Sequence, residues 1–82
     1  MPVVLRIKGY LFRFYSADLD EPPHVHVEKQ GKHAKIWVDP VEVARPGRYR
    51  SHELMEIQRI VQENQDIILE VWSNEQNKRK NF

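Results

Sequence analysis

The stretch from His24 to Asp39, HVHVEKQGKHAKIWVD, decides the fold. Apolar and polar side chains alternate on both sides of Gly31, and this period of two is the pattern of a half-buried β-strand. A glycine between two such runs is typical of a tight hairpin turn. We therefore expect an antiparallel β-hairpin with one apolar and one polar face.

The turn of this hairpin determines which side chains lie opposite one another. With Gly31 and Lys32 as the turn residues, the expected register has three pairs on its polar face: Glu28 with Lys35, His26 with Trp37, and His24 with Asp39. The apolar face carries Val25, Val27, Ala34, Ile36 and Val38. A turn that is longer by two residues shifts the pairs and keeps the faces, because side chains alternate along a strand.

The flanking sequence extends the hairpin into a small sheet. Strand patterns cover residues 3–8 and 10–16, with a turn at Gly9, and a further short strand is expected over 41–44. Residues 18–23 form a loop, since they are acidic and include two prolines. We expect these segments to form an antiparallel meander of three to five strands.

The C-terminal part has the pattern of a helix that begins with Ser51 as its N-cap. Apolar residues recur at helical spacing, with 64–66 as a weak middle: Leu54, Ile57, Val61, Ile68 and Trp72. The expected fold is therefore an α+β domain over residues 1–77, in which one long C-terminal helix packs on the meander. Residues 78–82 are expected to form a flexible basic tail.

Length and composition limit the class of protein. The chain has 82 residues, no cysteine and a formal net charge of +1, which predicts a single domain in a reducing compartment, the cytoplasm. No segment approaches the ~18 apolar residues of a membrane span, so we expect no membrane association. Residues 1–50 carry nine Lys/Arg against six Asp/Glu, whereas 51–77 carry one against six. Self-association into a homo-oligomer is a reasonable expectation for so small a core.

The polar face of the hairpin contains the candidate site. Two imidazoles two residues apart point the same way, and a carboxylate opposite one of them can orient its ring. We therefore take His24, His26 and Asp39 as candidate catalytic residues, with a binding set of four: Lys35, Trp37, Arg6 and Arg13. No metal and no cofactor are expected, because the pair of histidines lacks a certain third ligand.

Other interpretations of these residues stay open. His24 and His26 could simply occupy a half-exposed face beside Trp37, without chemistry. The aromatic residues of 10–14 are expected to build the core rather than to stack on bases. The basic connector before the helix could hold an anion through three side chains: Arg45, Arg48 and Arg50.

The segment EPPHVHV at 21–27, followed by AKIWVDPV at 34–41, resembles a small bacterial family. This family is known as domain of unknown function number four-one-six-zero. Similar features at the start of the chain and in the helix near Trp72 extend the resemblance over residues 1 to about 73. Members are often encoded beside another very small protein, in arrangements like toxin–antitoxin pairs. The resemblance thus implies a cognate small protein as partner.

Three functions follow from these observations. The first is a toxin–antitoxin component that contacts or cleaves RNA through the polar hairpin face. The second is a non-catalytic protein–protein interaction module. The third is a small metal-binding protein that uses His24 and His26.

Overall fold

The computed structural model describes residues 3–80 and contains one five-stranded antiparallel sheet. The strands follow one another in the sheet in chain order: β1 (Val3–Ile7), β2 (Tyr10–Arg13), β3 (His24–Lys29), β4 (Lys32–Val38) and β5 (Val41–Arg45). The expected α+β class and the meander are therefore confirmed. β5 corresponds to the short further strand expected over 41–44.

The central hairpin has a different register from the expected one. Its turn residues are Gln30 and Gly31, which both have positive φ, and not Gly31 and Lys32. A two-residue turn of this kind matches the twist of the flanking strands and favours glycine at its second position. His24 consequently lies opposite Trp37, and His26 opposite Lys35. The shift is two residues, so both faces keep the expected side chains.

The C-terminal region consists of two helices rather than one. α1 (Ser51–Glu63) and α2 (Gln65–Lys80) meet at Asn64, within the expected weak middle. Ser51 is the first residue of α1, and the N-cap is Arg50, whose backbone amide donates to Glu53 Oε1 at 2.9 Å. Residues 78–80 of the expected tail continue α2, while 81–82 lie outside the described residues.

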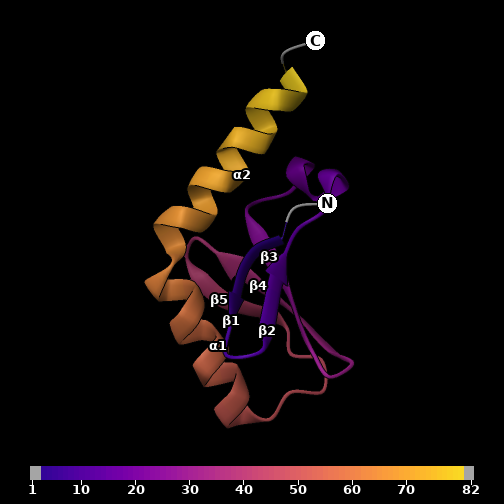
Figure 1. Cartoon of the computed structure of the whole chain (residues 1–82), viewed down its shortest axis with the longest axis vertical. Coiled ribbons are helices and arrows are strands. Elements are labelled where there is room, and N and C mark those ends of the chain that lie inside the picture. Colours follow the sequence, from indigo (N-terminus) through magenta and orange to yellow (C-terminus); the bar gives the residue numbers. More distant parts are fainter. Residues whose placement is uncertain (1–2, 81–82) are drawn as a thin grey trace.

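The helices lie along one side of the sheet, and α2 extends past its end, next to a short 3₁₀ helix, η1 (Ser16–Asp20) (Figure 1). The expected loop 18–23 thus begins within η1. None of the helices in the described part of the chain combines the length and apolar character that a bilayer span requires.

The core fills the space between the inner face of the sheet and the helices. Its strand side includes the aromatic residues of β2 and the apolar hairpin face: Tyr10, Phe12, Val25, Val27, Ala34, Ile36 and Val38. The helical stripe is confirmed, with Ile57, Val61, Ile68 and Trp72 buried and Leu54 partly buried. Trp72 forms a second, smaller cluster with Phe14 and Leu19. This cluster fixes η1 against α2.

Candidate functional site

The outer face of the sheet carries a row of basic side chains. Cross-strand pairing places one residue from each of four strands side by side: Arg13 on β2, His26 on β3, Lys35 on β4 and Arg45 on β5. Neighbouring strands are about 4.8 Å apart, so the row crosses most of the sheet. Three members of the row contact carboxylates, since Arg13 pairs with Glu28, His26 with Asp18, and Lys35 with Glu21.

Asp18 of η1 holds both histidines of β3. Its Oδ2 atom lies 3.0 Å from His26 Nε2, and its Oδ1 atom lies 3.4 Å from His24 Nε2. Oδ2 also accepts a hydrogen bond of 2.8 Å from the Tyr15 amide. An ionised carboxylate only accepts hydrogen bonds, so His26 Nε2 carries the proton of this contact. The second nitrogen of His26, Nδ1, then remains for other interactions.

His24 is enclosed at the end of the sheet. Its side chain is 0% exposed, and its ring packs edge-on against Trp37 at a centroid distance of 5.5 Å and lies 5.4 Å from the ring of Trp72. Its Nδ1 atom lies 2.9 Å from the carbonyl oxygen of Pro22. A side chain so enclosed cannot touch a substrate. His24 therefore supports the site, whereas His26, with its side chain 31% exposed, is accessible.

The environment of Asp18 favours its ionised form. Burial alone would raise the pKa of this carboxyl group, but the hydrogen bond from the Tyr15 amide and the contacts with His26 and His24 outweigh it and lower the pKa. A carboxylate beside an imidazole orients the ring and stabilises the imidazolium that forms when the ring accepts a proton. Asp18 and His26 thus have the arrangement of an acid–base dyad.

A hollow of about 220 Å³ opens beside His26 on the same face. Its lining contains four basic side chains and no carboxylate: His26, His33, Lys35 and Arg45, together with Ala34 and Gly47. We call this the basic hollow. No ion-pair partner of Arg45 is found within the described residues, 3–80. The basic hollow is therefore suited to an anion.

The other expected site residues have different positions. Asp39 is exposed in the turn between β4 and β5, and it is Asp18, not Asp39, that contacts the histidines. Trp37 lies beneath the Lys35 ammonium group, which is 4.6 Å from the centre of the ring. Arg6 is exposed on β1 opposite Leu11, away from the basic hollow. Arg13 is adjacent to His26 in the register.

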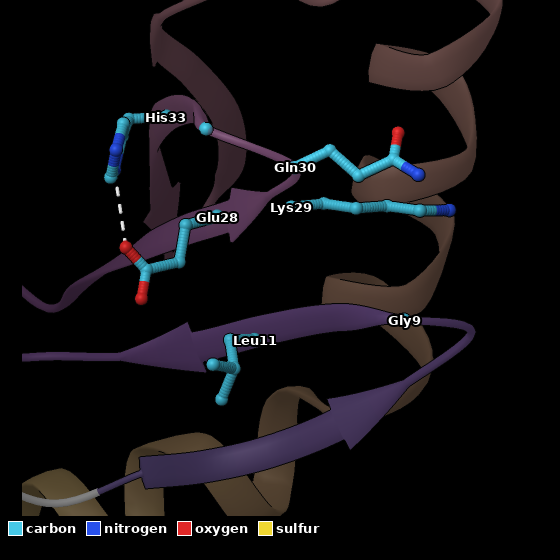
Figure 2. Close-up of a pocket in the computed structure, with 7 residues that line it drawn as sticks. Gly9, Leu11, Glu28, Lys29, Gln30 and His33 are labelled. Carbon is cyan, nitrogen blue, oxygen red and sulfur yellow. Dashed lines mark ion pairs between the residues drawn. The ribbon is translucent and has the colours of Figure 1, made fainter.

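A second hollow, of about 290 Å³, lies between the β1–β2 and β3–β4 turns. Figure 2 shows Glu28 and His33 in it pointing toward one another, and His33 Nδ1 is 3.2 Å from Glu28 Oε2. Glu28 also pairs with Arg13. This carboxylate makes the second hollow less suitable for an anion than the basic hollow.

Sequence reasoning missed Asp18 as the partner of the histidines and His33 as a lining residue. The sequence predicts a loop at Asp18, because residues 18–23 are acidic and include two prolines. A usable signal was present: Tyr15, whose amide binds Asp18 Oδ2, is three residues earlier. An acidic residue at that spacing often accepts a hydrogen bond from the backbone where a helical turn begins.

The structure thus combines an α+β fold, a five-stranded meander with two helices, with a histidine–aspartate cluster beside a basic hollow. The sequence model of the family described as "Domain of unknown function (DUF4160)" matches residues 9–73, most of the chain. The protein therefore belongs to this family, as the resemblance implied, and β1 precedes the matched region. No match was found among curated proteins or among solved structures.

Proposed function

We propose that the protein is the RNA-directed component of a toxin–antitoxin-like pair, and that it binds single-stranded RNA in the basic hollow. The observation that carries this proposal is the lining of that hollow, which, within residues 3–80, places the unpaired Arg45 beside Lys35, His26 and His33 and includes no carboxylate. Lys and Arg contacts to phosphate position a strand, and the free Arg45 guanidinium can bind phosphate with two hydrogen bonds. Its partner in this pair would be the small protein that is encoded beside such family members.

The Asp18–His26 dyad suggests the chemistry at the bound phosphodiester. His26 Nδ1 would accept the proton of the ribose 2′-hydroxyl, whose oxygen then forms a bond to phosphorus. The bond from phosphorus to the 5′-oxygen breaks, and water supplies the proton for that leaving oxygen. Proton transfer by a positioned side chain contributes about 10²–10⁴-fold to a rate. The product of this step is a 2′,3′-cyclic phosphate.

The test is cleavage of a short end-labelled RNA by purified, tag-free protein. We expect His26→Gln to reduce the rate at least about 10²-fold while RNA affinity changes little. His52→Gln is the matched control, because His52 is exposed on α1 and outside the basic hollow. A DNA strand of the same sequence should bind without cleavage, since it lacks the 2′-hydroxyl.

A binding measurement tests the hollow separately. Arg45→Gln should weaken RNA binding. It should also reduce the magnitude of the slope of log K against log salt by about one, because one phosphate contact is lost. The control is Arg59→Gln, which removes an equal charge from an exposed position on α1. Equal affinities and slopes for the two variants, or cleavage retained by His26→Gln, would contradict the proposal.

A non-catalytic interaction module is the second candidate, and one observation favours it. Two large apolar side chains of the helices are exposed, Met55 by 68% and Ile67 by 51%. A partner that covers these two side chains would bury apolar surface. A protein that binds its encoded neighbour but neither binds nor cleaves RNA would support this candidate.

A further inference from the structure

The contact between His24 and Asp18 contains an unusual feature. His24 Nε2 is buried and makes no hydrogen bond within the described part of the chain, although it lies 3.4 Å from Asp18 Oδ1. Nδ1 of the same ring faces the carbonyl oxygen of Pro22, which only accepts, so Nδ1 carries a proton and donates it there. In a neutral ring the unprotonated Nε2 therefore lies next to a carboxylate oxygen.

Such an arrangement is repulsive unless a positive charge lies between the two atoms. A second proton on the ring would supply that charge, and so would a metal cation bound to both atoms. Buried polar atoms without partners are rare in folded proteins, which makes this nitrogen informative. His26 Nε2 and the other oxygen of Asp18 are adjacent, 3.0 Å apart.

We propose that Asp18, His24 and His26 form a binding site for a divalent transition-metal ion. Their ligand atoms all lie within 4.8 Å of one another. Zinc binds histidine nitrogen and carboxylate oxygen at about 2.0–2.2 Å, so two tetrahedral ligands are about 3.3 Å apart. The two contacts with Asp18, of 3.0 and 3.4 Å, are close to this value. Binding of one ion by all three ligands requires side-chain rotations, for which the partly exposed His26 has more room than the buried His24.

The surroundings resemble those of metal-binding histidines. The hydrogen bond from His24 Nδ1 to Pro22 fixes the ring and leaves Nε2 as the ligand, as second-sphere groups do in metal sites. Two imidazoles favour zinc, cobalt or iron(II) over magnesium and calcium. Three protein ligands leave at least one position for water, and the exposed edge of His26 provides access.

This site does not depend on RNA binding, and its existence is tested without RNA. The same His26 Nε2 atom cannot ligate a metal and carry the proton of the Asp18–His26 dyad. RNA cleavage that persists in the presence of a chelator would therefore identify the metal-free dyad as the acting group. Metal affinity and RNA cleavage can fail independently of one another.

The experiment consists of two titrations of tag-free protein. The melting temperature is the readout for Zn²⁺, and visible absorption is the readout for Co²⁺. We expect one ion to bind per chain. Zn²⁺ should raise the melting temperature, whereas Mg²⁺ should leave it unchanged. A tetrahedral Co²⁺ site gives characteristic visible bands. His26→Gln and Asp18→Asn should abolish both responses.

His52→Gln is the matched control, because His52 is exposed on α1 and lies outside both the proposed ligand set and the basic hollow. It should keep both responses. His26→Gln is preferred to a change at buried His24, since a half-exposed side chain is replaced with less effect on folding. An absent response in the wild type would overturn the proposal. An equal response in His26→Gln would also overturn it and indicate binding at other surface groups.

Discussion

At the scale of single residues, the chemistry of the site depends on Asp18. The sequence predicted that a carboxylate orients the histidines, but assigned this role to Asp39. The spacing of Tyr15 and Asp18 could indicate the start of a helical turn, but it could not show which side chains Asp18 contacts. Those contacts form only when η1, held by the packing of Leu19 on Trp72, lies beside β3. The face of the sheet that carries His24 and His26, in contrast, could be predicted, because side chains alternate along a strand.

Asp18 should make the stability of the protein dependent on pH. The folded state lowers the pKa of this carboxyl group, so the unfolded chain binds the proton more readily. The stabilisation is complete above the unfolded pKa, near 3.9, and is lost as the pH falls through the folded pKa. Urea unfolding of wild type and Asp18→Asn should show a difference in stability that shrinks toward acid pH. A difference that stays constant from neutral to strongly acid pH would exclude this role.

At the scale of elements, the strands and the helical region were predicted more completely than the register of the central hairpin. Alternation identified the strands, and the spacing of apolar residues identified the helical region. The hairpin register was wrong because glycine was placed first in the turn, whereas Gln30-Gly31 and Lys8-Gly9 both place it second. The preference for glycine at the second position of such turns was the available signal. The break at Asn64 separates α1, which packs on the main core, from α2, whose Ile68 joins the same core and whose Trp72 belongs to the smaller cluster.

Because α1 packs on the sheet, shortening one of its buried side chains should have a large effect on stability. Ile57 is fully buried, so Ile57→Ala should lower the free energy of unfolding by about 2–5 kcal/mol. Met55, on the same helix, is 68% exposed, and Met55→Ala should change stability by no more than about 0.5 kcal/mol. Denaturant unfolding followed by circular dichroism measures both. Similar values for the two variants would show that α1 does not pack as described.

The connector between β5 and α1 approaches β4 very closely at Gly47. A Cβ atom at Gly47 would lie 1.7 Å from the carbonyl oxygen of His33, whereas one at Gly31 would meet nothing within 4 Å. Both glycines have positive φ, so both substitutions by alanine cost about 1 kcal/mol of backbone strain. Gly47→Ala should be clearly the more destabilising, and it should also disturb the basic hollow. Equal melting temperatures for the two variants would contradict this close approach.

At the scale of the whole molecule, the two sides of the sheet have separate roles. The inner side is covered by the helices and supplies the buried core. The outer side carries the basic row and the basic hollow. Charge composition shows only that acidic residues are concentrated in the helical region. Composition could not show which cations are already paired with carboxylates and which, like Arg45, are available.

The central claim is that the outer face binds RNA at the basic hollow, and backbone amide NMR with a short single-stranded RNA tests it most directly. The account predicts shifts concentrated at the hollow's lining, His26, His33, Lys35 and Arg45, which weaken as salt is added. Amides of the exposed face of α1, around Met55 and Arg59, should remain unchanged. Shifts confined to the helices, or no shifts at low salt, would contradict the account.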